Sequence, residues 1–406
     1  MKGRNRDGIT VYNGRRVTTC ARMTVVLFVI AALGWTLVAL SQLGVIYTLV
    51  AALAARRAFS RARRAGDGPA PDVTIVKPLN GADRGLRDRL ETFCRQAYPG
   101  RIQIVFGVHD DADPAIAIVR ALQLAYPTVD IELVIDPRIH GANRKATNLI
   151  NMADSARNEV LILSDADIVV GADYVRTVTT ALSEPGVGLV SCLYVGEGRG
   201  GLWARLSAMA INYRFIPGAI VGKATGLAEP CFGATIAVRS EVLERIGGFA
   251  AFANHLADDY EIGRAVRQLG LKIAMPPMVV THMCDERSAR ELIVRELRSG
   301  RTVRQIDPVG YAGSFVTYPF PLILIAAAMV GPRLVMLCLV ASVLAVRIAF
   351  KLVFDAATGE RAGAWWLIPV SDVLSFGLFI ASFGVNRVGW HGTNFRVSRE
   401  GALLHS

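Results

Sequence analysis

Apolar stretches at both ends of the chain enclose a longer and more polar middle section. Residues 23–54 are almost uninterruptedly hydrophobic, and a membrane-crossing helix needs about 20 such residues. The same length argues against a cleavable signal peptide. Beyond Pro308 the chain is apolar again, and we expect three further spans at residues 315–330, 334–350 and 365–385. A tight turn at Gly331–Arg333 should join the first two, and a polar loop at residues 351–363 should precede the third.

The middle section alternates between short runs of β-forming residues and amphipathic runs of helical period. Strands are predicted at 73–77, 102–109, 131–135 and 160–163, and helices at 86–97, 115–125 and 144–153. This alternation is typical of an α/β fold with a mostly parallel, Rossmann-like sheet. We therefore expect an extension at 1–22, a transmembrane helix at 23–55, an α/β domain at 72–308, three transmembrane helices within 313–386 and a tail at 387–406.

The composition fits a membrane protein that carries one soluble domain. Of the 406 residues, 52% are hydrophobic and only 19% are charged, and the formal net charge is +11. Five arginines directly after the first apolar stretch favour a cytoplasmic domain and a membrane surface as partner: Arg56, Arg57, Arg61, Arg63 and Arg64. Basic residues before the stretch oppose this orientation. One hypothesis is that the natural chain starts at Met23, which would remove the conflict.

Nucleic-acid binding and a cysteine framework both lack support in the sequence. The chain has neither an aromatic-rich basic stripe nor the spacing of zinc ligands, so we expect no nucleic-acid partner. Its six cysteines are scattered without a Cys-x-x-Cys pair, which implies neither disulfides nor zinc. Reduced thiols in the cytosol are the simplest interpretation.

Asp165 and Asp167 stand at the end of an apolar run that is predicted to be a buried strand. Carboxylates beside such a strand are costly unless a cation or hydrogen bonds compensate. Side chains two residues apart in an extended segment point the same way, so both carboxylates can hold one divalent ion. Two aspartates that hold a metal on a diphosphate form the DxD signature of nucleotide-sugar glycosyltransferases.

Two loops offer residues for binding a nucleotide. Asp110 and Asp113 follow the strand at 102–109 and either form a solvated turn with a helix N-cap or contact uracil, ribose or metal. Arg144 and Lys145 open the helix at 144–153, which is either a basic helix start on the surface or a site for a diphosphate.

Two helices and one apolar stretch complete the set of candidates. Asp258 and Asp259 open a helix, where they either complement its dipole or include a general base for an acceptor hydroxyl. Arginines at 295, 298, 301 and 304 either bind lipid headgroups or stabilise a departing diphosphate. Residues 201–220 either lie at the bilayer surface and guide a lipid headgroup or pack within the domain.

Taken in order, these residues resemble the ceramide glucosyltransferase family (glycosyltransferase family 21, close to family 2), and within it the bacterial hopanoid-biosynthesis-associated branch. The resemblance covers about Val73 to Arg304. The matching residues are Val76–Gly81, Leu90–Phe93, Asp113–Ala115, Asn143–Lys145, Asn148–Leu149, Asp165–Asp167, Gly247–Phe249, Ala257–Tyr260, and Arg295 with Arg298.

The resemblance implies a GT-A fold, a UDP-sugar donor, Mg²⁺ or Mn²⁺, and inversion at the anomeric carbon. It implies donor binding by Asp113 with Asp110 beside it, by Lys145 and by Asp165. It also implies metal binding by Asp165 and Asp167 and catalysis by Asp259 with Asp258, Arg295 and Arg298. One position departs from the family pattern, because Ser299 stands where a tryptophan is expected.

The expected reaction moves N-acetylglucosamine or glucose from a UDP-sugar to a lipid hydroxyl. The resemblance implies a hopanoid or a ceramide-like lipid as acceptor, and a multi-pass enzyme of the bacterial cytoplasmic membrane with its catalytic domain in the cytoplasm. Two alternatives remain at this point. One is a polyprenyl-phosphate glycosyltransferase or polysaccharide synthase, and the other is an inactive nucleotide-sugar-binding membrane protein, for which Ser299 is the only support.

Overall fold

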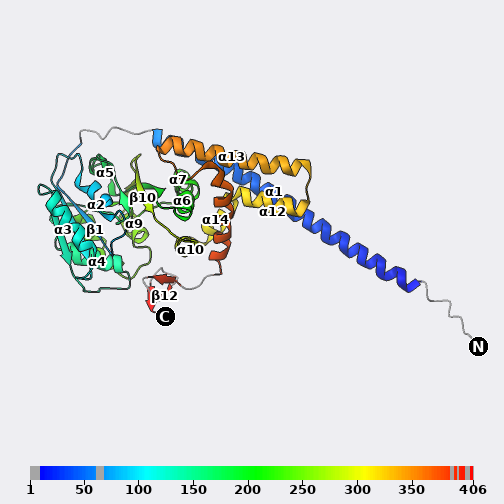
Figure 1. Cartoon of the computed structure of the whole chain (residues 1–406), viewed down its shortest axis with the longest axis horizontal. Helices are drawn as coiled ribbons and strands as arrows, with labels where there is room; N and C mark the ends of the chain where they lie inside the picture. The colour runs from blue at the N-terminus through cyan, green and yellow to red at the C-terminus, as the bar shows by residue number, and fades with distance from the viewer. Residues whose placement is uncertain (1–9, 61–67, 385–387, 391–392, 398–402, 406) are drawn as a thin grey trace, which may run out of the picture.

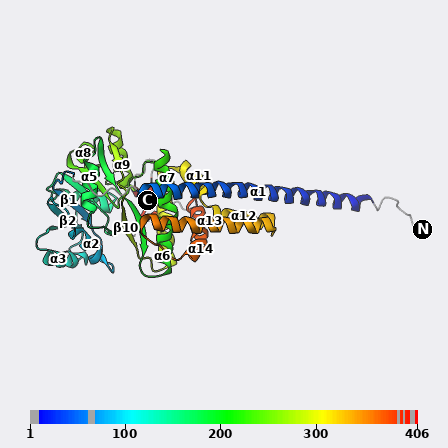
Figure 2. The same cartoon turned by 90° about the horizontal axis from the view of Figure 1, so that it is seen from above.

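An α/β domain and a group of apolar helices make up this computed structural model (Figures 1 and 2). The structure describes residues 10–60, 68–384, 388–390, 393–397 and 403–405. The α/β domain lies at one end of the long axis, and the apolar helices extend from it toward the other end, where α1 (Thr10–Ser60) projects beyond its neighbours.

The domain is built on a seven-stranded sheet of order β3-β2-β1-β4-β8-β6-β9. The first four strands in this order are mutually parallel, and β8 pairs antiparallel with both β4 and β6. The predicted α/β fold with a mostly parallel sheet is therefore confirmed. The strands are β1 (Val73–Pro78), β2 (Ile102–Val108), β3 (Asp130–Ile135), β4 (Val160–Leu163), β6 (Val187–Ser191), β8 (Ile236–Arg239) and β9 (Lys272–Ala274).

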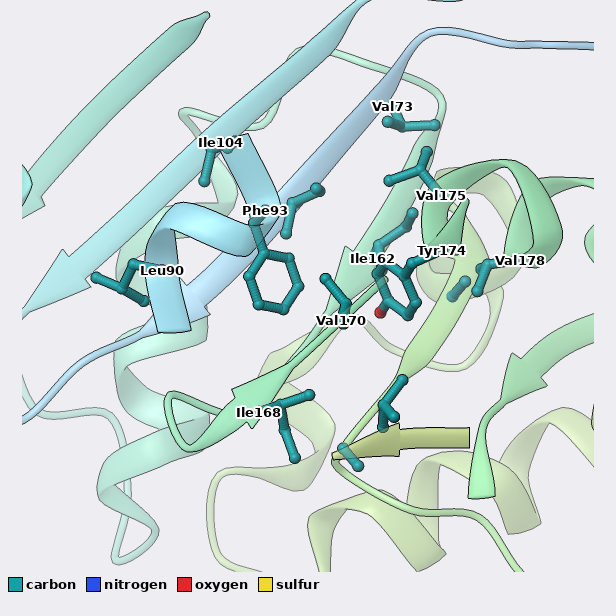
Figure 3. Packing of buried hydrophobic residues seen from close by; sticks show 14 of the residues in the cluster. Val73, Leu90, Phe93, Ile104, Ile162, Ile168, Val170, Tyr174, Val175 and Val178 are labelled. Carbon is teal, nitrogen blue, oxygen red and sulfur yellow. The ribbon is translucent and has the colours of Figure 1, made fainter. Parts of the chain in front are cut away.

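Helices cover both faces of this sheet because alternate strand residues point to opposite sides. Ile75, Ile104 and Ile162 pack on one face against Phe93 and Tyr174, as Figure 3 shows in part. Val76, Val105 and Leu163 pack on the other face. The covering helices include α2 (Leu86–Cys94), α3 (Ala115–Ala125), α4 (Arg144–Ala153), α5 (Tyr174–Leu182), α8 (Ser240–Arg245) and α9 (Asp258–Gln268).

A second, three-stranded sheet stands beside the main one. Its order is β5-β10-β7, with β10 (Val279–Cys284) parallel to β7 (Leu193–Gly198) and antiparallel to β5 (Ile168–Val169). Since β5 directly follows the two aspartates after β4, this pairing brings β10 next to the DxD segment. The main-chain N–H of Met283 donates to the carbonyl of Asp167 over 2.9 Å.

The stretch at residues 201–220 packs inside the protein. It forms α6 (Leu202–Ala210), the π-helix η1 (Ile211–Phe215) and the first part of α7 (Ile216–Thr225). Its residues share one buried cluster with β7 and with the apolar helices α1 and α13. Of the two interpretations of this stretch, the structure therefore supports packing over an exposed position at a membrane surface.

Among the residues that the structure describes, three helices are long and apolar enough to cross a membrane: Met23–Phe59 within α1, α13 (Leu334–Thr358) and Trp365–Ser382, which ends in α14 (Ile368–Ser382). The expected span at 315–330 is not one straight helix. Instead, α11 with η3 (Pro308–Thr317) and α12 (Pro319–Val330) meet at an angle of 65°. Pro319 and Pro321 in the first turn of α12 explain the break, because proline cannot continue a preceding helix.

The predicted polar loop at 351–363 is wrong over its first part, because α13 continues to Thr358 and ends at Gly359. Its charges are accommodated inside the protein by pairing. The Nζ of Lys351 contacts Asp355 Oδ2 at 2.5 Å, and both side chains are buried. The described parts of the expected tail form a small antiparallel sheet of β11 (Val388–Trp390), β12 (Thr393–Val397) and β13 (Leu403–His405).

Candidate active site

Asp165 and Asp167 occupy the short loop between β4 and β5, at the carboxyl edge of the main sheet, where open α/β sheets bind ligands. Their side chains are 35% and 45% exposed. The fully buried Lys77 of β1 holds this loop through its Nζ, which donates to the Asp165 carbonyl over 2.8 Å. The same Nζ lies 3.6 Å from the Phe93 ring centre. Burial lowers the pKa of Lys77 to about 7, although Asp165 and Asp167 oppose the shift.

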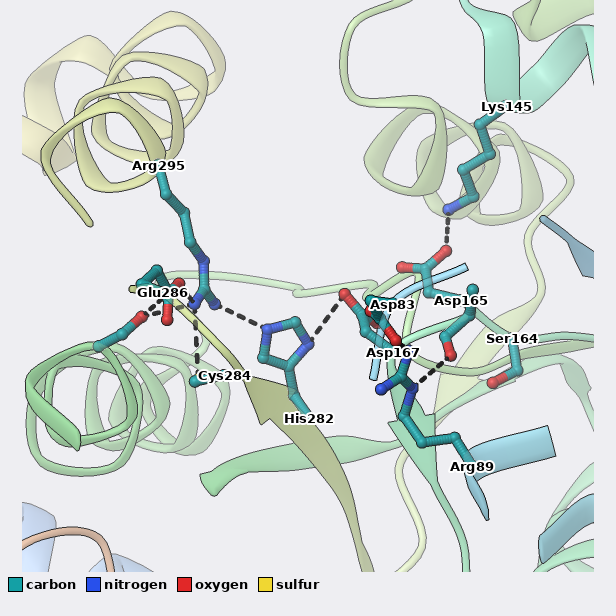
Figure 4. Close-up of polar contacts among 12 residues, drawn as sticks. Asp83, Arg89, Lys145, Ser164, Asp165, Asp167, His282, Cys284, Glu286 and Arg295 are labelled. Carbon is teal, nitrogen blue, oxygen red and sulfur yellow. Dashed lines mark hydrogen bonds and ion pairs between the residues drawn. The ribbon is translucent and has the colours of Figure 1, made fainter. Parts of the chain in front are cut away.

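Lys145 connects the DxD segment to the first turn of α9. It follows the N-cap of α4, where the Asn143 side chain accepts from the Ala146 N–H. Its Nζ lies 2.7 Å from Asp165 Oδ1 and 3.6 Å from Asp258 Oδ2 (Figure 4 shows the first contact). Burial disfavours the ammonium, but the surrounding carboxylates outweigh this and raise the pKa of Lys145. Lys145 is therefore a fixed positive charge at the centre of three carboxylates.

Burial shifts the pKa in the same direction for two of these carboxylates, Asp165 and Asp259. Burial raises the pKa of Asp165, and Asp167 adds to the effect while Lys145 opposes it. Burial followed by the charge of Asp258 raises the pKa of Asp259 to about 6, again against Lys145. Asp259 Oδ2 accepts from the Gly233 N–H over 3.0 Å, and its Oδ1 accepts from the Tyr260 N–H over 2.8 Å. Two main-chain hydrogen bonds thus orient the Asp259 carboxylate, and its surroundings increase its basicity.

A second chain of contacts runs from Asp167 to α10 (Ala289–Ile306) (Figure 4). His282 Nδ1 lies 3.4 Å from Asp167 Oδ2, and its Nε2 lies 2.8 Å from the Arg295 guanidinium. Arg295 also donates to Glu286 and to Ser207. Burial disfavours a charged His282, but Asp167 outweighs this and raises the pKa of His282 to about 10, so a proton is held on Nδ1, facing Asp167. Burial would raise the pKa of Asp167, but His282 and then Arg295 lower it overall.

A cleft of about 430 Å³ opens beside the DxD segment. The loop after β1 forms one wall and the DxD segment forms the other; the lining residues are Asn80, Gly81, Ala82, Asp83, Leu86, Arg89, Ala166 and Asp167. Asp113 reaches this wall through the Gly81 N–H, which donates to its Oδ2 over 2.9 Å, while its Oδ1 caps α3 at Ala115. Asp110 is exposed and accepts from the Ala112 N–H within its own turn.

The predicted site residues therefore fall into three groups. Asp165, Lys145, Asp258 and Asp259 form one cluster, and Asp167 with Arg295 forms the adjoining chain through His282. Asp113 supports the cleft wall and Asp110 stays in its turn, as in the N-cap interpretation of the sequence. Arg298 lies exposed on α10, and Ser299 beside it is exposed as well.

The donor set around Asp167 fits a hard divalent cation together with a substrate phosphate. Mg²⁺ is usually bound through one or two carboxylates plus phosphate oxygens, and Asp165 and Asp167 supply the carboxylates. Within the described residues, Asp167 Oδ1 is shielded from solvent and has no hydrogen-bond partner, which leaves it available as a ligand. No set of three or more His, Cys, Asp or Glu side chains stands ready as a complete metal site in that part of the chain. The remaining ligands would have to come from substrate and water.

Sequence reasoning missed two residues that organise this site. Lys77 is the only charged residue in β1, and a charge inside a predicted buried strand is a readable signal. His282 gave no comparable signal, because a single histidine among the apolar residues of β10 is commonly a core residue. Its role depends on the pairing of β10 with β5, which joins segments more than 100 residues apart.

Comparison with known protein families gives a match over most of the chain. The model of "Glycosyl transferase family 21" matches residues 36–403. Two Caenorhabditis elegans proteins are similar. Ceramide glucosyltransferase 1 is 26% identical over 240 residues, which are 59% of this chain and 50% of that protein. Ceramide glucosyltransferase 3 is 28% identical over 211 residues, which are 52% and 45%. The chain thus spans about half the length of the curated relatives it matches.

Among solved structures, the chain is similar to a mannosyltransferase from Pyrobaculum calidifontis in complex with GDP-Man and Mn²⁺. The sequence identity is 21%, the alignment covers 85% of this chain and 98% of the other, and the TM-score is 0.47.

Proposed function

The chain belongs to glycosyl transferase family 21, and on this premise we propose that it transfers a sugar from a UDP-sugar to the hydroxyl of a membrane lipid. The observation that carries the proposal is the meeting of four carboxylates, Asp165, Asp167, Asp258 and Asp259, at one edge of the sheet. Lys145 holds three of them together, and the cleft of about 430 Å³ lies directly beside the fourth.

The UDP-sugar occupies the cleft, with its diphosphate toward Asp165 and Asp167. These two aspartates would hold Mg²⁺ or Mn²⁺, which as a Lewis acid neutralises charge on the diphosphate when bound. Lys145 adds a positive charge on the side of α4, and Asp113 keeps the Gly81 wall of the cleft in place. Asp110 lies at the nucleoside end, next to Asp113 in the same turn.

Asp259 acts as the general base. It takes the proton of the acceptor hydroxyl while that oxygen bonds to the anomeric carbon. The bond from this carbon to the diphosphate oxygen breaks at the same time, and its electron pair leaves with UDP. One displacement of this kind inverts the configuration at the anomeric carbon. A pKa of about 6 suits the task, because a base is most effective when its pKa lies near the working pH. Asp258 supports this basicity through its negative charge.

The two arginines of the family motif have different roles in this proposal. Arg295 is bound to His282, Glu286 and Ser207, so it positions His282 and through it Asp167. Arg298 lies one turn further along α10, within electrostatic range of both Arg295 and Asp167, because burial and Arg295 lower its pKa while Asp167 opposes the shift. It supplies charge for the departing diphosphate.

The acceptor approaches from the side of the apolar helices. An aromatic group of Tyr194, Phe215 and Phe232 lies between His282 and that side, with ring centres 5.5–5.8 Å apart. The Tyr194 ring lies 5.9 Å from the ring of His282. Flat apolar surfaces of this kind suit a hopanoid or a ceramide-like lipid. We place the enzyme in the bacterial cytoplasmic membrane, with the α/β domain in the cytoplasm, because arginines follow α1 directly.

The test uses the full chain in lipid nanodiscs with Mn²⁺. UDP-glucose and UDP-N-acetylglucosamine are each offered with ceramide or with a hopanoid polyol, and lipid products are measured by mass spectrometry. A lipid that carries one added sugar supports the proposal. A product that grows by repeated addition would favour a polysaccharide synthase instead. Calorimetric binding of UDP without product from any donor and acceptor pair would favour an inactive binding protein.

A further inference from the structure

The helix α14 has its polar and apolar faces reversed relative to a helix at a water-exposed surface. Four polar residues face the protein and are at most 9% exposed: Ser371, Asp372, Ser375 and Ser382. Large apolar residues point outward. Val370, Val373 and Ile380 are each 47–49% exposed. A water-facing helix buries its apolar stripe, so the outer face of α14 is suited to lipid.

Both ends of α14 are attached to elements of the α/β domain. At its start, Leu367 and Ile368 belong to the buried cluster of α6 and β7. At its end, the Ser382 carbonyl accepts from Arg304 of α10 over 2.7 Å, and the Ser382 and Tyr311 hydroxyls lie 2.9 Å apart. A helix that crossed the bilayer would carry one end away from the domain. Instead α14 runs along the domain, transverse to α1 and α13 in both views (Figures 1 and 2).

A buried ion pair fixes this transverse orientation. Arg347 of α13 binds Asp372 of α14 through two hydrogen bonds of 2.7 Å, and it also donates to the Tyr213 carbonyl of the π-helix. A two-point contact between a guanidinium and a carboxylate restrains direction as well as distance. The middle of α14 is therefore held to α13, and its ends are held to the domain.

The two apolar helices before α14, α12 and α13, form a hairpin that leaves the domain and returns to it. At the start of α12, Pro319 packs against Gly44 of α1, and at its end Val330 lies against Gly34, nearer to the N-terminus of α1. Next, α13 runs back, so that Phe354 meets Phe59 near the end of α1 with ring centres 6.4 Å apart. The chain thus leaves the domain along α12 and comes back along α13 before α14 begins.

We propose that α14 lies in the plane of the membrane, at the headgroup boundary of the leaflet next to the α/β domain, and does not cross the bilayer. The occupant of its outer face is the lipid of that leaflet. Trp365 and Trp366, both 58% exposed at its start, are the residue type that prefers this boundary. Composition alone would read Trp365–Ser382 as a span, because its 18 residues are apolar enough. The position of α14 in the membrane does not depend on the sugar transfer proposed above.

Depth-dependent fluorescence quenching tests the proposal directly. Single cysteines replace Trp366, Val373 or Ile380 in a chain whose Cys20, Cys94 and Cys338 are serine, and each carries an environment-sensitive dye. The full chain is placed in nanodiscs whose lipids carry a quencher either at the headgroup or deep in the acyl chain. We expect all three positions to be quenched mainly by the headgroup probe. The control, Leu43→Cys, lies near the middle of the apolar helix Met23–Phe59 at a position 54% exposed and should be quenched mainly by the deep probe.

The position that decides the outcome is Val373, in the middle of α14. A crossing helix would bring Val373 near the bilayer centre, so strong quenching by the deep probe would overturn the proposal. Sidedness gives a second measurement. One probe is an epitope tag after Ser406, and the other is Leu124→Cys, at a position 84% exposed on the α/β domain. Both should react with membrane-impermeant reagents from the same side of sealed vesicles. Reaction from opposite sides would also overturn it. Neither readout uses sugar transfer, so failure here leaves the proposed function to its own assay.

Discussion

Lys145 and Asp165 form an ion pair, with Nζ 2.7 Å from Oδ1, at the position where the proposed reaction needs a divalent cation and a diphosphate. Lys145 also lies close to Asp258, and its positive charge partly offsets the rise in the pKa of Asp259 that burial and Asp258 cause. One ammonium therefore connects the proposed metal-binding aspartate, Asp165, to the proposed general base, Asp259. Changes at either end of this connection should be measurable at the other.

Asp259→Asn should abolish most turnover and leave UDP binding nearly unchanged. The amide keeps the size of the side chain but cannot take a proton, and a positioned base contributes about 10²–10⁴-fold to a rate. Initial rates of lipid glycosylation and calorimetric titration with UDP measure the two effects separately. Glu261→Gln is the matched control on the same helix, because Glu261 pairs with the exposed Arg264. Near-normal turnover in Asp259→Asn would refute the assignment.

The rate should fall in acid with an inflection near pH 6 in kcat/KM, because Asp259 must be unprotonated to accept a proton. The two neighbouring charges predict opposite shifts of this inflection. Asp258→Asn removes a negative charge, lowers the pKa of Asp259 and should move the inflection to lower pH. Lys145→Gln removes a positive charge, raises that pKa and should move it to higher pH. Shifts of the same sign in both variants would contradict the arrangement.

Asp167 should depend on the Nδ1–H of His282 for its orientation. His282→Ala removes this donor, and loss of a group that orients a metal ligand typically costs about 10–100-fold in metal affinity. His282→Asn should retain most of the affinity, because its amide nitrogen takes the place of Nδ1. Mn²⁺ binding in the presence of UDP, followed by electron paramagnetic resonance, measures the difference. Equal affinities in the two variants would show that the hydrogen bond is unimportant.

The main sheet was predictable because its signal is local. Each strand from β1 to β4 is a short apolar run and each intervening helix is amphipathic, so the strands, helices and aspartates at the sheet edge could all be read from neighbouring residues. The insertion of β8 between β4 and β6 could not be read in this way, because it joins segments more than 40 residues apart. The same holds for His282, which depends on the pairing of β10 with β5. The break before Pro319, by contrast, was readable from its prolines.

Gly233→Ala should disturb the site without disturbing the fold. A Cβ at this position would lie 2.8 Å from Lys145 Nζ and 3.0 Å from Asp165 Oδ2, so the ion pair would have to move. Misplacement of reacting groups by about 1 Å can cost on the order of 10²-fold in rate. Gly313→Ala is the control, because its Cβ meets nothing within 4 Å among the described residues. Thermal unfolding should separate the two effects, with the melting temperature nearly unchanged in both variants.

Ser299→Trp should restore the family residue at little cost to stability. Ser299 is exposed on α10, next to the exposed Arg298, so its small side chain leaves no buried space that an indole would otherwise fill. Surface substitutions of this kind usually change the free energy of unfolding by about 0.5 kcal/mol or less. The exposed indole can act only on molecules that approach α10 from outside, and we therefore expect a change in KM for the lipid acceptor with little change in KM for the UDP-sugar. A loss of thermal stability by several degrees, relative to Ser299→Ala, would show that the position is packed in the working enzyme.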